Sequence, residues 1–202
     1  MGWEKTVLNG VSVIGLIVIC VVISLVFAVQ TGVIDQTYEP DVNGPTNTSG
    51  VPEVSASNYS SVDGEELEMA IYHEVNERRA DAGKERLVHS ERVRLIARLH
   101  SKDMADRDFF DHTNPDNLGS PGRHEKYDGC ESTNENLYFL KPLPTNNSVR
   151  IAEKVVNSWA NSSGHNTTQM SESYYVTGVG VYITQNSTLY VTQNFCREHP
   201  NA

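Results

Sequence analysis

No segment of this 202-residue chain limits its folding as strongly as the uncharged apolar run at residues 7–29 (VLNGVSVIGLIVICVVISLVFAV). As a helix, about 20 such residues span the hydrocarbon core of a bilayer. A buried helix of a water-soluble domain would show a polar face with a period of about 3.6 residues, and none is visible here. We therefore expect a retained transmembrane anchor at 7–29, preceded by a short cytoplasmic tail at 1–6.

A cleaved signal peptide is the competing interpretation, because Val26, Phe27 and Ala28 offer a peptidase small or modest side chains. Against it, the run exceeds the roughly 7 to 15 apolar residues of a signal peptide, and Lys5 is the only basic side chain before it. The anchor is favoured, and cleavage would make the protein secreted instead.

The charges that flank the run predict its orientation. Lys5 lies on its short N-terminal side, whereas the next basic residue downstream is Arg78, which follows several acidic residues. Basic residues favour the cytoplasmic side of a membrane. We therefore expect a single-pass protein of the cell membrane with its C-terminal domain outside the cell. Six Asn-x-Ser/Thr signals beyond the run agree with export and are candidate glycosylation sites: Asn47, Asn58, Asn146, Asn161, Asn166 and Asn186.

Net charge and cysteine content exclude some classes of function. Sixteen Lys and Arg against 26 Asp and Glu give a formal charge of −10, which disfavours a nucleic-acid partner. Three cysteines are too few for a four-cysteine zinc site or a cysteine-dense mini-protein. Cys130 and Cys196 are the only pair outside the apolar run, and in an oxidising compartment such a pair most often forms a disulfide; two unpaired thiols are the alternative.

Residues 30–63 read as a flexible extracellular linker. Of these 34 residues, 18 are Gly, Pro, Ser, Thr or Asn, and none is basic. A segment of this composition cannot bury enough apolar surface to fold by itself. We expect the folded domain to occupy 64–199.

The folded part opens with helical patterns and closes with strand patterns. Asp63 and Ser90 are N-caps for helices that end near Gly83 and Arg107, and a third helix is predicted at 149–161. Alternating apolar residues at 179–183 and 189–195 predict a hairpin, and the Gly- and Pro-rich segment 109–130 predicts a long loop. Helices followed by strands predict an α+β domain.

A set of motifs runs through this part in a fixed order: Asn76 and Arg79, ARLHSKDMA at 97–105, FFDH at 109–112, ENL at 135–137, WANSSGHN at 159–166, GVGV at 178–181 and TQNF at 192–195. Their order and spacing resemble the CAP superfamily of cysteine-rich secretory, antigen 5 and pathogenesis-related 1 proteins, in particular its microbial SCP-like extracellular branch. The resemblance implies an α-β-α sandwich with a central antiparallel sheet, and a cleft lined by two histidines and acidic residues.

The resemblance also assigns site residues. His112 and His165 match the two cleft histidines, and Glu135 matches the glutamate of the family's Gly-Glu-Asn-Leu motif. Asn134 stands where that motif has Gly, and Ser162 stands where the animal and plant branches have a fourth, acidic member. The residues expected to line the cleft are Glu135, Ser162, Asn136 and His124.

Two imidazoles and a carboxylate in one pocket could hold a divalent cation such as Zn²⁺ or Ca²⁺, with His112 and His165 as its ligands. A hydrogen-bonded polar cluster without a metal is the alternative.

We expect a binding module for a lipid, a surface glycan or a protein. A metal-assisted hydrolase or protease, with His112, Glu135 and His165 as catalytic residues, is the other candidate, and enzymatic activity is left open. A serine protease is disfavoured because no Gly-x-Ser-x-Gly segment occurs. His100 is expected to be a hydrogen-bonded core residue.

Overall fold

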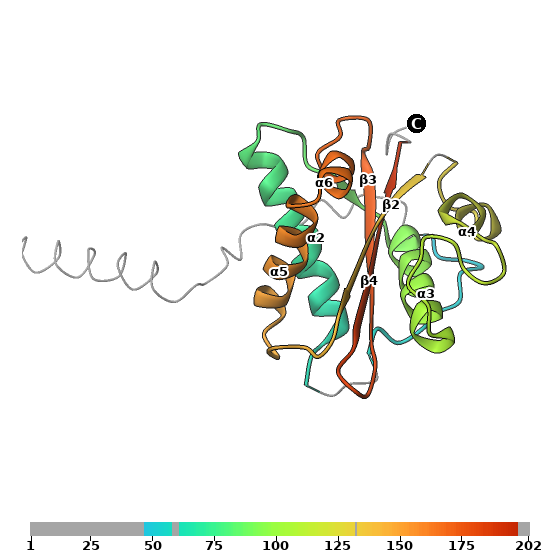
Figure 1. Ribbon diagram of the computed structural model, residues 1–202. Helices are drawn as coiled ribbons and strands as arrows, with labels where there is room; N and C mark the ends of the chain where they lie inside the picture. Colours follow the sequence, from blue (N-terminus) through green and yellow to red (C-terminus); the bar gives the residue numbers. More distant parts are fainter. Residues whose placement is uncertain (1–46, 58–60, 132, 198–202) are drawn as a thin grey trace, which may run out of the picture. The chain divides into compact units, whose positions relative to one another are not determined.

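Three layers make up the part of the chain that the structure, a computed structural model, describes: residues 47–57, 61–131 and 133–197. A four-stranded sheet lies between helices on both faces, as Figure 1 shows with the sheet seen edge-on. One face is covered by α2 (Gly64–Asp81), α5 (Ser148–Ala160) and α6 (Ser163–Gln169), and the other by α3 (Glu91–Arg107) and α4 (Ser120–Lys126). The predicted α+β class and its sandwich of layers are confirmed.

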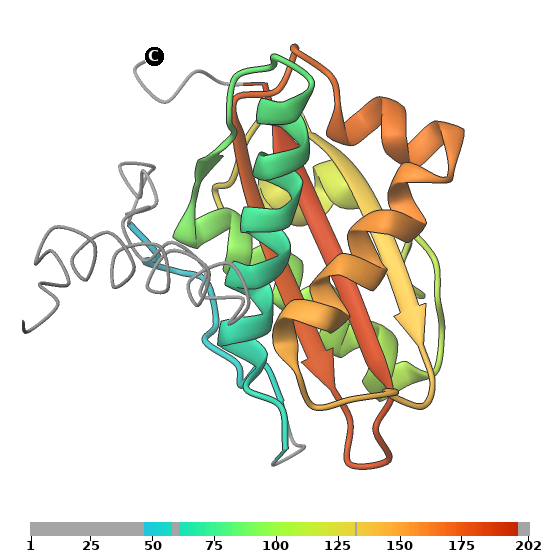
Figure 2. The ribbon, with the colours of Figure 1, turned by 90° about the vertical axis from the view of Figure 1, so that its left-hand side faces the viewer.

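The sheet has the strand order β1-β3-β4-β2. Its strands are β1 (Val88–His89), β2 (Thr133–Leu140), β3 (Val176–Ile183) and β4 (Leu189–Cys196). The predicted hairpin is β3 with β4, and β2 pairs antiparallel with β4 at the outer edge. The short β1 pairs parallel with β3, so the sheet is not antiparallel throughout. Figure 2 views the sheet from the side that α2 and α5 cover.

Side-chain caps define where the long helices begin, as predicted. The carboxylate of Asp63 accepts hydrogen bonds from the amides of Glu65 and Glu66, and the Ser90 hydroxyl accepts one from the amide of Val93. The third predicted helix, 149–161, is α5. Its buried face packs with α2 against the sheet around Trp159, whose indole N–H donates to the Leu137 carbonyl over 2.8 Å.

Four elements were not predicted: α4, α6, the two-residue β1, and β2. In α4 and α6 few residues are buried and no apolar period marks the helix. In β2 the first half presents the polar residues Glu135 and Asn136 to the interior, where strand patterns normally place apolar ones. These elements are formed by tertiary contacts rather than by local pattern.

Two glycines in β3 allow α3 to lie directly on the sheet. A Cβ atom on Gly178 would be 2.2 Å from the backbone nitrogen of Arg94, and one on Gly180 would be 1.9 Å from that of Arg98. The neighbouring Val179 and Val181 belong to the core on the α2 side. The GVGV motif therefore separates a backbone-packing face from an apolar face on one strand.

A buried ion pair closes the outer edge of β3. The Glu68 carboxylate of α2 accepts hydrogen bonds from the Arg98 guanidinium, from Arg94 over 2.7 Å, and from the amide of Val181 over 2.9 Å. Farther along the same edge, the amide of Ile183 donates to the carbonyl of Ala56. These contacts satisfy strand amides that the two-residue β1 does not reach.

The described end of the expected linker, 47–57, lies against the domain. Val51 packs on Leu95 and Ile96, and the Arg98 guanidinium of α3 donates to the carbonyl of Val54. The structured part therefore begins at least as early as Asn47. Composition alone gave no sign of this, because the contacts are made by arginines and apolar residues that lie far ahead in the sequence.

Residues 1–46 lie outside the described residues, and so do the expected tail at 1–6, the expected anchor at 7–29, the first part of the linker and the signal at Asn58. Within the described ranges, no helix is both long enough and apolar enough to cross a bilayer.

We predict that Gly180→Ala destabilises the fold by about 3 kcal/mol, because the added methyl group overlaps the backbone of α3 and the helix must shift away. Gly164→Ala is the matched control, since a Cβ at that position meets no atom within 4 Å. The free energy of unfolding from urea titrations measures both. Equal values for the two variants would contradict the close packing of α3 on β3.

Candidate functional site

Glu135 is the centre of the site that the structure forms from the expected residues. It lies on β2 opposite Asn194 of β4 and is only 5% exposed. One carboxylate oxygen, Oε2, accepts a hydrogen bond from the Arg123 guanidinium of α4 over 2.5 Å. The other, Oε1, lies 2.9 Å from Nδ1 of His112. Both oxygens of this buried acid are therefore engaged by cationic or polar partners.

The two partners determine the ionisation of Glu135. Burial by itself would raise the pKa of this carboxyl, but the hydrogen bond from His112 and the charge of Arg123 outweigh it, so its pKa lies below the ordinary value. The same hydrogen bond raises the pKa of His112 above its ordinary value, against the opposing effect of burial. Glu135 is thus a permanent carboxylate at neutral pH, and it favours the protonated form of His112.

Arg123 joins the carboxylate to the loop that carries His112. Besides its bond to Glu135, its guanidinium donates to the carbonyl of His112 over 3.0 Å and to that of Leu118 over 2.8 Å. Sequence patterns did not mark this residue as part of the site. Pro121 at the start of α4 is a helix-start signal that could have placed Arg123 on a helix rather than in a loop.

His165 lies on α6, which hydrogen bonds hold against β2. The Asn136 side chain donates to the carbonyl of His165 over 3.1 Å, and Arg79 of α2 donates to the carbonyl of Gln169 over 2.7 Å. Side chains alternate along a strand, so Asn136 and Glu135 face opposite sides of β2. Since β2 is the edge strand, the site extends around the open edge of the sheet, with His112 on one side and His165 on the other.

The two histidines interact electrostatically. Burial lowers the pKa of His165, and the charge of His112 lowers it further. The two residues differ in environment, because the His112 side chain is 56% exposed while His165 is half-buried. Protonation of His112 therefore opposes protonation of His165, and the pair favours at least one neutral imidazole near neutral pH.

His100 of α3 lies under the site as a buried, neutral residue. Its Nε2 is 3.0 Å from the carbonyl oxygen of Asp111 and 4.0 Å from the Glu135 carboxylate. Burial lowers the pKa of His100 to about 4, so it carries no charge at neutral pH. The expectation of a core histidine held by a hydrogen bond agrees with this geometry. By bonding the residue before His112, His100 helps to position that loop.

The other expected lining residues are placed as follows. Ser162 is the N-cap residue of α6 and is half-buried, three residues before His165. His124, which we expected in the cleft, is fully buried on α4, where its Nδ1 accepts a hydrogen bond from the amide of Cys130 over 3.1 Å. The carboxylates and amides of the site thus come from β2, and its cations from α4 and the loop before it.

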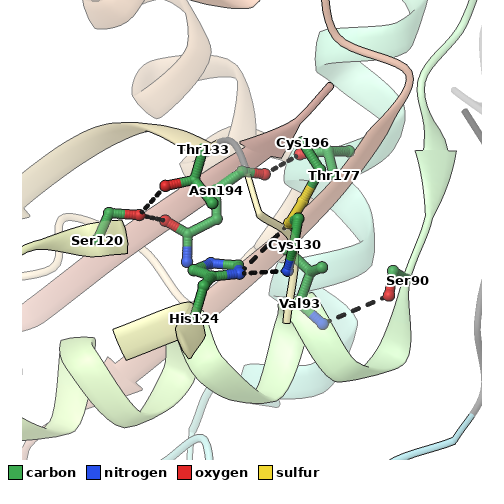
Figure 3. Close-up of a disulfide and its surroundings, with 9 residues drawn as sticks. All are labelled: Ser90, Val93, Ser120, His124, Cys130, Thr133, Thr177, Asn194 and Cys196. Atoms are coloured by element: carbon green, nitrogen blue, oxygen red, sulfur yellow. Dashed lines mark hydrogen bonds between the residues drawn. A yellow bond between two sulfur atoms is a disulfide. The ribbon is translucent and has the colours of Figure 1, made fainter. Parts of the chain in front are cut away.

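Cys130 and Cys196 form the predicted disulfide, with their Cα atoms 5.8 Å apart. Figure 3 shows the His124 ring directed at Cys130 beside this bond. Across the described ranges, His124, Cys130 and Cys196 are the one set of three potential metal ligands whose ligand atoms all lie within 4.8 Å of one another. Because the two sulfur atoms are bonded to each other, they cannot bind a metal as thiolates while the disulfide is intact.

The asparagines of the glycosylation signals are mostly at the surface. Asn47, Asn146, Asn161 and Asn186 are exposed, and Asn166 of α6 is half-buried. Asn166 also accepts a hydrogen bond from the side chain of Gln169 within α6. The four exposed positions are the ones that a glycan could reach without disturbing a helix.

We predict that Glu135→Gln lowers the pKa of His112, because the amide removes the negative charge that favours the imidazolium. An NMR titration of the histidine ring protons measures this, and the His112 midpoint should move to lower pH. His73 on α2 is the internal control in the same spectra: its pKa is lowered chiefly by burial, with no contribution from Glu135. An unchanged His112 titration would contradict the pairing with Glu135.

Comparisons with known proteins agree with this fold. The cysteine-rich secretory protein family, CAP, matches residues 72–195. The uncharacterized protein YkwD of Bacillus subtilis (strain 168) is 30% identical over 137 residues, which cover 67% of this chain and 47% of that protein. The chain therefore spans about half the length of this curated relative.

Two solved structures are similar to the chain. One is an extracellular protein containing an SCP domain from Bacillus anthracis, with a TM-score of 0.55 and 25% identity over 66% of this chain and 41% of that one. The other, an outer surface protein of Borrelia burgdorferi, shares the fold with a TM-score of 0.56 and 20% identity, over 68% of this chain and 97% of that one. Since the family match covers more than half of its residues, the chain belongs to the cysteine-rich secretory protein (CAP) family and has bacterial SCP-like proteins among its relatives.

Proposed function

We propose that the protein is a membrane-anchored extracellular binding module whose His112 and His165 hold Zn²⁺ and whose cleft binds a lipid, a glycan or a protein of the cell surface. The observation that carries the proposal is the hydrogen bond between the buried Glu135 carboxylate and Nδ1 of His112. It leaves Nε2 of a half-exposed imidazole for an external ligand.

A carboxylate bonded to one nitrogen of a histidine is a common arrangement behind a zinc ligand. The acid fixes the tautomer and the orientation of the ring, and it makes the other nitrogen a stronger donor. Glu135 fits this supporting role better than the role of a ligand, because Arg123 and His112 already engage both of its oxygens. His165 would supply the second imidazole, with water or a bound molecule completing the coordination.

The donor set favours zinc over calcium. Ca²⁺ prefers six to eight oxygen ligands, whereas imidazole nitrogen suits Zn²⁺. The described residues around His112 and His165 offer nitrogen, while the nearest carboxylate is committed to an ion pair. With only two protein ligands, the affinity would be modest, and open positions would remain on the metal.

The membrane and extracellular parts of the proposal rest on the sequence. The apolar run at 7–29 and the distribution of basic residues support an anchored protein with its domain outside. The disulfide supports an oxidising compartment. The Bacillus anthracis relative is described as extracellular, which agrees. Removal of the run by a signal peptidase would leave the same domain in secreted form.

The His112–Glu135 pair also favours a second candidate, a metal-assisted hydrolase or protease. A histidine oriented by a carboxylate can accept and donate protons, and the hydrogen bond to Glu135 raises the pKa of His112 above its ordinary value. Turnover that chelation abolishes and that His112→Ala removes would distinguish this candidate from a pure binding module.

Calorimetric titration of the full chain with Zn²⁺ tests the metal site. We expect one bound ion per chain, and His112→Ala and His165→Ala should each weaken binding by at least about tenfold. His73→Ala is the matched control, since that histidine lies on α2 outside the site. The disulfide is kept oxidised, so that His124 and the two cysteines cannot compete as a thiolate site. Zinc binding that survives both substitutions would contradict the assignment.

A further inference from the structure

A patch of aromatic side chains in tilted and edge-on contact lies on the same face of the sheet as Glu135. Phe110 and Phe139 are 49% and 42% exposed, unusually open for large apolar residues in the described part of the chain. Their ring centroids are 5.7 Å apart, and those of Phe139 and Tyr190 are 5.1 Å apart in an edge-on arrangement. Exposed aromatic rings that gather in one place mark an interaction site more often than single exposed residues do.

A hollow of about 500 Å³ adjoins this patch at the end of the sheet near the β3–β4 turn. Aromatic and polar groups share its wall. The aromatic side chains of the wall are Phe139, Tyr182 and Tyr190, and its polar side chains include Asp108, Gln185 and Asn186. Pockets that combine apolar faces with a few carboxylates and amides bind ligands that are themselves amphipathic.

A sugar ring has this character. One face of a β-linked pyranose presents C–H groups that pack on an aromatic ring, while its rim presents hydroxyls that both donate and accept hydrogen bonds. Carboxylates accept such bonds, and amides both donate and accept them. A fatty-acyl chain has no group that could bond the Asp108 carboxylate or the Gln185 amide of this wall, and covering them would remove their water. A phosphate group is disfavoured, because the carboxylates of Asp106 and Asp108 outnumber the one cation, Lys141, in the wall of the hollow.

The patch is continuous with the proposed metal site. Glu135, Leu137 and Phe139 occupy alternate positions of β2 and so face the same side, with Phe139 about 13 Å beyond Glu135. Phe110 likewise precedes His112 by two residues. A chain of several sugar rings could therefore lie over the aromatic patch and reach the site at its other end.

We propose that the patch formed by Phe110, Phe139 and Tyr190, with the hollow beside it, is a subsite for a β-linked oligosaccharide. This inference rests on the proposed function, since it makes a glycan the ligand of the same binding module. It assigns stacking to the exposed rings of Phe110 and Phe139, which rest on the buried Tyr190, and hydroxyl recognition to the polar side chains of the hollow.

The test uses full-length protein in lipid nanodiscs, produced in a bacterial host without N-glycosylation so that Asn186 is unmodified. Calorimetry measures binding of β-1,4-linked tetrasaccharides of glucose and of N-acetylglucosamine. We expect at least one to bind. Phe139→Ala should weaken binding about tenfold, and Phe139→Tyr should retain it, because the stacking face is kept.

Val149→Ala is the matched control, because Val149 is an exposed apolar residue of α5, 37% exposed, outside the patch. The Val149→Ala variant should bind the tetrasaccharide with the affinity of the wild type. Phe110→Ala provides a second test if Phe139→Ala folds poorly. Binding of neither tetrasaccharide, or binding that Phe139→Ala and Phe110→Ala leave unchanged, would overturn the subsite. The zinc titration of the same protein without sugar separates the two proposals, since absence of zinc binding with sugar binding intact counts against the metal site alone, and zinc binding without sugar binding counts against the subsite alone.

Discussion

A buried carboxylate must be paired, and the pairing of Glu135 organises one end of this domain. Leaving such a charge without a partner would cost about 3–5 kcal/mol. Arg123 and His112 meet this requirement, and each comes from a segment without an apolar pattern of its own. Their bonds to Glu135 fix α4 and the loop at 109–119 against β2. The polar site is therefore part of what holds the fold together, as well as the place where a ligand could bind.

The long helices and the hairpin could be predicted because their own residues specify them. Asp63 and Ser90 cap α2 and α3 as the sequence suggests, and the apolar period of α5 marks the face that it buries. β2, α4 and α6 could not be predicted in this way. Their buried positions are polar, such as Asn136 and His124, and their partners lie far away in the sequence. Local patterns carry no signal for contacts of that kind.

The sequence could name candidate residues of the site but not the contacts among them. The family resemblance pointed to His112, Glu135 and His165, and the structure brings His112 and Glu135 into direct contact. The resemblance did not reveal that Arg123 joins Glu135 to the loop, or that His124 lies buried beside the disulfide. The resemblance also gave no sign that Phe139 and Glu135 share a face of β2. Residues 135 and 139 can be assigned to one face only once the segment is known to be a strand.

We propose that Glu135 orients His112 to bind a metal together with His165. The most direct measurement is an anomalous X-ray difference map from crystals of the protein grown with Zn²⁺ and an intact disulfide. We predict one strong peak about 2 Å from Nε2 of His112 and within bonding reach of the His165 ring. A fully occupied zinc elsewhere, with His112 and His165 bound to nothing but water, would contradict it.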